Sequence, residues 1–221
     1  MPKRSAGLSE PAYNHLLNLI MTKQLMPGER IPETRIAKEF NISRTPVRDA
    51  MRQLSNDGLI EIFPNRFAQV RVFSPEDIRE IGTVRIALDT LSVKLANLYG
   101  SHADFLQLQA LATQCSEAYA AGDEQLRFSS DGDFHLELSR IAGNDLLYKF
   151  QKELHLRIQF IQLHHPSRVE NERIHIQQHH DIVNALMEHN ETRAQTLICD
   201  HLKSFYNLED EYPKDFFPIT L

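Results

Sequence analysis

The strongest constraint on the fold is the run 41–52, NISRTPVRDAMR, which predicts a helix with one buried and one cationic face. Ser43 is a suitable N-cap, because its hydroxyl can accept a hydrogen bond from the first turn. The following apolar residues recur at helical spacing and define the buried face: Val47, Met51 and Leu54. The opposite side receives three arginines within nine residues: Arg44, Arg48 and Arg52.

A shorter helix is expected just before this one, from about Glu33 to Phe40, buried through Ile36. Asn41 then lies in the connecting turn, since asparagine tolerates a left-handed backbone. A helix that presents hydroxyl and guanidinium groups from its first turns is typical of a helix-turn-helix that reads a DNA major groove. The residues expected to face DNA from it are Ser43, Arg44, Thr45 and Arg48.

The surrounding pattern adds one more helix and a hairpin. The helix is expected from about Ser9 to Lys23, with Ser9 as its cap and Leu16, Leu17 and Ile20 inward. After Gly58, two short apolar strands flank the tip Pro64-Asn65-Arg66. From that tip, Arg66 can reach the phosphate backbone or a minor groove.

The run from Leu25 to Val70 resembles the winged helix-turn-helix of the GntR family of bacterial transcription regulators. The resemblance rests on the Pro27-Gly28 turn, the core 43–48, the helix end 57–59 and the wing 64–66. It implies that the chain binds double-stranded DNA, with Asn65 and Arg66 as further contacts. Better-known relatives have arginine at the position of Thr34, and the neighbouring Arg35 is expected to replace it. Because one winged helix makes few base contacts, we expect a homodimer on a palindromic operator.

Charge divides the chain at Phe73. The net charge of −6 would by itself argue against nucleic acid. Residues 1–73, however, hold 11 Lys and Arg against 7 Asp and Glu, a balance of +4. Residues 74–221 hold 13 against 23, a balance of −10. A basic head on an acidic body suits a DNA-binding domain at 1–73 and a separate domain at 74–221.

The second part reads as all-helical. Ser74-Pro75-Glu76-Asp77 is a helix start, with a cap, a proline and acidic residues in the first turn. Six helical patterns follow, at roughly 75–99, 103–121, 123–142, 145–164, 170–189 and 191–208. The predicted fold class is therefore mainly α: a winged helix of three helices and a two-stranded wing, followed by an all-α six-helix bundle. Residues 1–8 are expected to be disordered, and the tail 212–221 to be irregular and packed on a partner subunit.

Two cysteines and no apolar run of about 20 residues predict a chain with no disulfide framework and no membrane span. The start Met-Pro-Lys-Arg leads into no continuous apolar segment, so no signal peptide is expected. These features together predict a cytoplasmic protein without a membrane partner.

Four polar side chains in the second part lie on helical faces that are otherwise apolar: Asp131, His135, His179 and His201. An unsatisfied buried polar group costs about 1–3 kcal/mol, so convergence on a divalent cation would satisfy all four. Their nitrogen and oxygen donors suit zinc first, with nickel, manganese or iron as alternatives. Competing ligands are His175, His180 and Asp133.

The pattern Asp131-x-x-Phe134-His135, followed by His179 and His201, resembles the metal site of the FCD ligand-binding domain. That domain follows the winged helix in the FadR subfamily of GntR regulators, and six helices resemble its VanR-like branch. The resemblance implies a small organic acid as effector of a regulator, which we expect to be a repressor and not an enzyme. Two alternatives stay open: a regulator that responds to the metal alone, and a mononuclear metalloenzyme with an accessory DNA-binding head.

Two arginines are candidates for binding the carboxylate of that effector. An arginine near a metal gives a carboxylate two anchors. Arg85 matches the arginine of the first FCD helix, and Arg157 lies in the fourth helix of the bundle. Arg85 flanks an apolar stripe expected to be buried: Val84, Leu88, Leu91, Leu95 and Leu98. The alternative for Arg85 is an ion pair with Asp89 at i,i+4.

Overall fold

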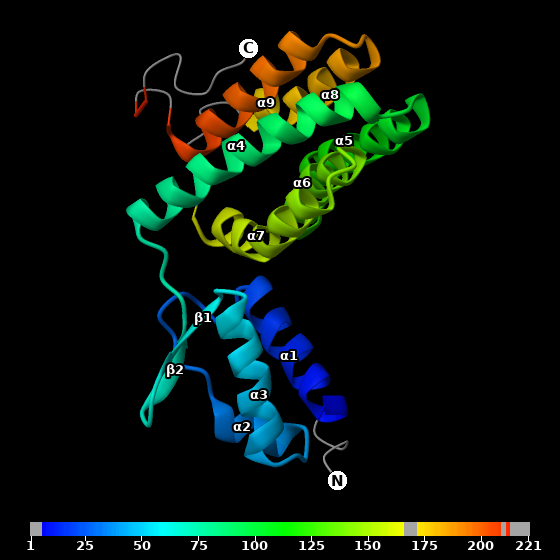
Figure 1. The fold of residues 1–221 in the computed structure, drawn as a ribbon. Coiled ribbons are helices and arrows are strands. Elements are labelled where there is room, and N and C mark those ends of the chain that lie inside the picture. The colour runs from blue at the N-terminus through cyan, green and yellow to red at the C-terminus, as the bar shows by residue number, and fades with distance from the viewer. Residues whose placement is uncertain (1–5, 166–171, 209–210, 213–221) are drawn as a thin grey trace. The chain divides into compact units, whose positions relative to one another are not determined.

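The computed structural model describes residues 6–165, 172–208 and 211–212, with side chains from residue 9 onward. The chain divides into two compact units, Met1–Phe73 and Ser74–Leu221 (Figure 1). The disorder expected at 1–8 falls outside the described residues for 1–5, whereas residues 6–8 are helical. The predicted tail, residues 212–221, lies outside the described residues except for Tyr212.

The first unit is a three-helix winged helix with a two-stranded sheet. Its elements are α1 Ala6–Met21, α2 Glu33–Glu39, α3 Arg44–Asn56, β1 Ile60–Phe63 and β2 Phe67–Val70. Helix α3 packs against both α1 and α2 through a shared apolar core, which includes Leu16, Ile20, Ile36, Val47 and Leu54. Leu17 is only half-buried. The expected cap at Ser9 is wrong, because the residues from Ala6 onward are already helical.

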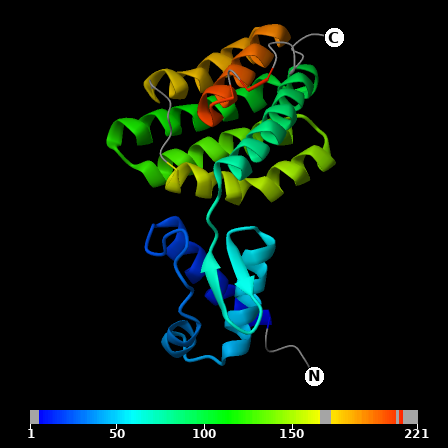
Figure 2. The ribbon, with the colours of Figure 1, turned by 90° about the vertical axis from the view of Figure 1, so that its left-hand side faces the viewer.

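The turn before α3 and the tip of the hairpin are formed as expected. Asn41 has a φ of 51°, the left-handed conformation that asparagine tolerates. Ser43 occupies the N-cap of α3, but its side chain makes no capping hydrogen bond, so the hydroxyl stays exposed. Strands β1 and β2 pair antiparallel with Phe63 opposite Phe67. Residues 64–66 are therefore the tip of the wing, visible beside α1–α3 in Figure 2.

The second unit is built from six helices among its described residues, close to the predicted bounds. They are α4 Pro75–Tyr99, α5 His102–Ala121, α6 Glu124–Ile141, α7 Asp145–His164, α8 Glu172–Met187 and α9 Glu191–Tyr206. The start of α4 has the expected capping box, in which Ser74 and Asp77 bond each other's backbone N–H. Helix α4 packs on α6 and α9, and α5 packs on α6 and α8. Side chains from α4, α6, α8 and α9 therefore share one interior.

The buried face of α4 is not the predicted one. Val84, Leu91 and Leu98 from the apolar stripe are 50%, 42% and 68% exposed. The helix instead buries a mixed face, in which Arg85, Asp89 and Ser92, at most 2% exposed, lie among the apolar residues Ile86, Val93 and Ala96. The expectation failed because burial was assigned to apolar residues, whereas opposite charges on this face pair with each other. A polar interior is thus part of the fold itself.

Cys115 and Cys199 are both free and buried, as expected for a chain without a disulfide framework. Among the described helices, none is both long enough and apolar enough to cross a membrane.

Candidate DNA-binding surface and metal centre

The residues predicted to contact DNA all lie exposed on the first unit: Arg35, Ser43, Arg44, Thr45, Arg48, Asn65 and Arg66. A groove of about 540 Å³ runs between α3 and the wing. Four arginines contribute to its lining: Arg44, Arg48, Arg52 and Arg66. A cationic groove next to an exposed helix can bind phosphates along its walls while the helix contacts base edges.

One acidic side chain joins the two central arginines of this surface. The Nε atoms of Arg44 and Arg48 both donate to Oε1 of Glu33, at 2.8 and 2.9 Å. Both arginine side chains nevertheless remain 58% exposed. The sequence reasoning placed Glu33 in α2 without assigning it a role, because the contact depends on how α2 packs against α3.

In the second unit, the four predicted metal ligands come together. One donor atom each from Asp131, His135, His179 and His201 lies within 4.8 Å of all the others. Helix α6 supplies the first two residues, α8 supplies His179 and α9 supplies His201. Nε2 of His179 is 3.2 Å from Oδ1 of Asp131, and Nε2 of His135 is 4.0 Å from the same oxygen. All four side chains are buried, so they form one enclosed donor set.

Several ring nitrogens of this cluster make no hydrogen bond and are therefore available to coordinate a metal ion. Both nitrogens of His135 and of His179 are buried and have no hydrogen-bond partner. Nδ1 of His135 lies 3.2 Å from Oδ2 of Asp89, within ion-pair distance but without hydrogen-bond geometry. Nδ1 of His201 lies 3.2 Å from Oε1 of Gln178, which favours an N–H there and a lone pair on Nε2. Imidazole lone pairs without a donor fit coordination to a metal.

The pKa shifts of His135, His201 and Asp131 favour the protonation states that a metal ligand needs. Burial, reinforced by the charge of Arg85, lowers the pKa of His135. Burial and the neighbouring histidines hold the pKa of His201 well below its ordinary value. Burial opposes ionisation of Asp131, but its contacts with His179 and His135 and the charge of Arg85 outweigh this and depress its pKa. Neutral imidazoles around an ionised carboxylate are what metal coordination requires.

The buried charges around the cluster do not balance. The guanidinium of Arg85 lies 3.4 Å from Asp89 and 3.6 Å from Oδ2 of Asp131. Gln162 donates to the same Oδ2 at 2.5 Å, so Oδ1 is left to the histidines. Counted without the histidines, the two carboxylates and the one guanidinium carry a formal charge of −1 in the interior. Because an uncompensated buried charge is costly, the residues present fit a divalent cation.

The competing ligands are placed differently. His180 is used elsewhere: its Nε2 is 2.8 Å from the Ser116 hydroxyl, and its Nδ1 contacts Gln109. The side chain of Asp133 is 51% exposed. His175 stacks on His201 with ring centroids 3.8 Å apart, and burial lowers its pKa to about 3. It borders the cluster without belonging to the four-donor set.

The two predicted effector arginines have different surroundings. Arg85 makes the ion pair with Asp89 that was the alternative, and its side chain is 2% exposed. Arg157 is half-buried on α7 and stays a prediction. A cavity of about 30 Å³ borders Asp131 and His175 and is lined by Arg127. The sequence analysis missed Arg127, although its position four residues before Asp131 puts both on one face of α6.

The family of bacterial regulatory proteins, gntR family, matches residues 8–70, and the FCD domain matches residues 80–204. The HTH-type transcriptional regulator YdhC of Bacillus subtilis is 32% identical over 195 residues, 87% of this chain and 77% of that protein. The Uxu operon regulator of Haemophilus influenzae is 29% identical over 197 residues, 80% and 72% of the two chains. The structure of E. coli McbR/YncC has the same fold, with a TM-score of 0.75 at 22% identity over 91% and 96% of the chains.

A winged helix joined to an FCD domain defines a DNA-binding transcriptional regulator. The chain belongs to the GntR family, in agreement with the resemblance of its sequence. The mainly α fold class is confirmed. The metalloenzyme alternative fails, because the relatives are transcriptional regulators.

Replacing His179 with alanine tests the metal centre. We expect the wild-type chain to retain about one zinc ion after dialysis, and zinc at about 100 times its Kd to stabilise it by about 2.7 kcal/mol. His179→Ala should lose both effects, since it removes one of four donors. His180→Ala is the matched control, because the adjacent imidazole bonds Ser116 instead. Elemental analysis and thermal melts give the answer; equal zinc content in the two variants would contradict the assignment.

Proposed function

We propose that this regulator is a homodimeric repressor whose affinity for a palindromic operator is set by a small carboxylate effector bound beside a divalent metal ion. The metal, zinc by its donor set, is held by Asp131, His135, His179 and His201. The observation that carries the proposal is a buried set of four donor residues, two of them histidines whose ring nitrogens have no hydrogen-bond partner.

Positive charge next to the cluster supports an anionic effector. The small cavity is lined by Asp131, by Arg127 and by Glu172, the ion-pair partner of Arg127. Nε of Arg127 is buried and has no hydrogen-bond partner, while its Nη1 contacts Glu172 at 3.2 Å. A carboxylate could thus be held by Arg127 while the metal polarises its oxygen. An effector reaches Arg85 only by displacing Asp89, Asp131 or Tyr206, so we assign Arg85 to positioning Asp131.

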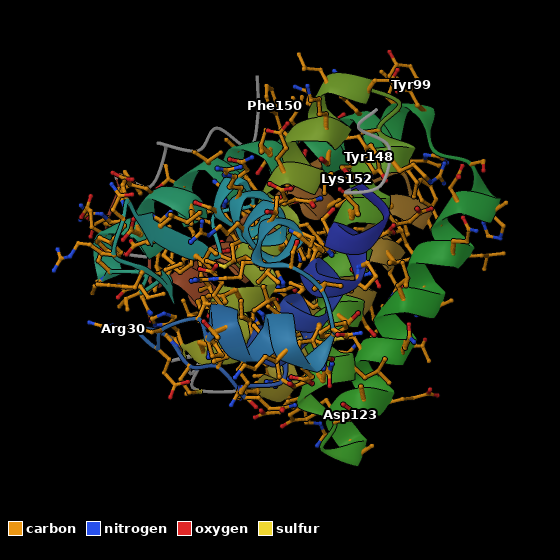
Figure 3. All side chains as sticks on the ribbon, turned by 90° about the horizontal axis from the view of Figure 1, so that it is seen from below. Arg30, Tyr99, Asp123, Tyr148, Phe150 and Lys152 are labelled. Atoms are coloured by element: carbon orange, nitrogen blue, oxygen red, sulfur yellow. The ribbon has the colours of Figure 1, made fainter. Side chains whose placement is uncertain are left out.

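The exposed apolar stripe of α4 supports a homodimer. Val84, Leu91 and Leu98 repeat at intervals of seven residues along its outer face. Tyr99 and Phe150 also point outward from the helical unit in Figure 3, and they are 65% and 46% exposed. Repression is supported by one relative, the HTH-type transcriptional repressor RspR of Escherichia coli K12, which is 26% identical over 199 residues, 89% of this chain and 86% of that protein.

A regulator that responds to the metal alone is the second candidate, favoured by the small volume of the cavity, about 30 Å³. The two candidates differ in what changes DNA affinity. In the first, the metal-loaded protein responds further to a carboxylate, since a ligand shifts an equilibrium only through differential affinity. In the second, chelation and reloading of the metal produce the whole response.

Replacing Arg48 with alanine tests the DNA-reading surface. We expect operator affinity to fall by about 1–3 kcal/mol, the usual worth of a bidentate arginine–base contact. Lys152→Ala, which removes the same charge from the second unit, is the control. Affinities can be measured by fluorescence anisotropy on a duplex selected from a randomised library. Unchanged affinity of Arg48→Ala for that duplex would remove Arg48 from the reading surface.

Replacing Arg127 with alanine tests the effector site. With a panel of mono-, di- and tricarboxylates, isothermal titration of the metal-loaded protein should detect binding that weakens at least tenfold in Arg127→Ala. Zinc content should be unchanged, because Arg127 is not among the four donors. Arg157→Ala is the control, and loss of carboxylate binding in that variant alone would transfer the role to Arg157. Absence of any carboxylate response in wild type would favour the metal-only regulator.

A further inference from the structure

The contact between Glu33 and the two reading arginines has a consequence for sequence specificity. Glu33 is the first residue of α2, and its side chain is only 18% exposed. Arg44 and Arg48 are one turn apart on α3, so their side chains lie on the same face. One oxygen of Glu33 accepts a hydrogen bond from each of them. A single carboxylate therefore fixes the stems of both side chains.

The atoms used in this contact leave the recognition fork of each arginine free. Glu33 engages only Nε, so Nη1 and Nη2 keep their four N–H groups. Two parallel N–H groups are what an arginine presents to O6 and N7 of guanine. Fixing the stem before DNA arrives lowers the conformational entropy lost on binding. Specific binding thus benefits from the contact.

The charge of Glu33 acts in the opposite direction on unspecific binding. Among the described residues that line the groove, Glu33 is the one carboxylate beside four arginines. It reduces the combined charge of the group formed with Arg44 and Arg48 from +2 to +1. Attraction to phosphates is independent of sequence and scales with the number of neutralised charges. Glu33 should therefore weaken attachment to arbitrary DNA.

We propose that Glu33 is a specificity-determining residue of the DNA-reading surface. It holds Arg44 and Arg48 in position for base edges, and its charge reduces their sequence-independent attraction to phosphate. The alternative is a carboxylate that merely competes with DNA for the two arginines. Removal of such a competitor would strengthen binding to every duplex by the same factor and leave discrimination unchanged.

Three variants of the 221-residue chain separate these effects. Glu33→Gln removes the charge and weakens the acceptor. Glu33→Asp keeps the charge but is one methylene shorter, so that it cannot hold both arginines. Glu39→Gln is the matched control, because it removes the same charge from the same helix at a site where the carboxylate lies 3.8 Å from Nε2 of His15. Thermal melts of all three variants check that the first unit stays folded.

The readout is affinity for two duplexes over a range of KCl concentrations. One duplex is the sequence that wild-type protein selects from a randomised library, and the other is a shuffled duplex of the same composition. For Glu33→Gln, we expect the ratio of selected to shuffled affinity to fall about tenfold or more. The log–log salt dependence on shuffled DNA should steepen by about 0.9, the value for one additional phosphate contact.

The remaining variants complete the test. Glu33→Asp should lower the affinity ratio without steepening the salt dependence, and Glu39→Gln should leave the ratio unchanged. An unchanged ratio in both Glu33 variants would overturn the proposal. So would equal losses of the ratio in Glu33→Gln and Glu39→Gln, since a general charge effect would then explain the result.

Discussion

The arrangement of the helical unit depends on one buried carboxylate, that of Asp131. Its Oδ2 faces Gln162 and Arg85, and its Oδ1 faces the histidines. Burial of an ionised group is tolerated only where partners replace the lost water. This requirement explains why α4 turns Arg85 inward and why neutral imidazoles gather opposite. The same carboxylate leaves the interior with an excess of one negative charge, which is the physical reason for expecting a cation there.

Burial of this polar face has a consequence on the outside of the molecule. Because α4 directs Arg85 and Asp89 inward, its apolar stripe is exposed and available to a second subunit. The DNA-binding unit uses a related device, in which the carboxylate of Glu33 organises two arginines. In both units, an acidic side chain fixes the positions of neighbouring side chains that are candidates for binding a charged ligand. Glu33 positions two arginines for DNA, and Asp131 lies among histidines suited to a metal ion.

Local patterns in the sequence predicted most of the fold. Asn41 and the capping box at Ser74 act through their own backbone, so both were predicted correctly. The convergence of Asp131 with three histidines was inferred from polar residues on apolar faces together with a family resemblance. Pairing between helices left no such local signal: Glu33 and Gln162 acquire their roles only when α2 meets α3 or when α6 meets α7. The exposed stripe of α4 was misassigned for the same reason, since hydrophobicity alone does not identify which face is covered.

X-ray absorption at the zinc edge of the zinc-loaded protein tests the central claim most directly. The account predicts four nitrogen or oxygen neighbours at about 2.0–2.1 Å, with the multiple scattering of three imidazole rings. Cys115 is buried and lines the same cavity as Asp131, which makes it the nearby source of a different ligand set. A sulfur neighbour at about 2.3 Å, or a shell of oxygen atoms without imidazole scattering, would contradict the account.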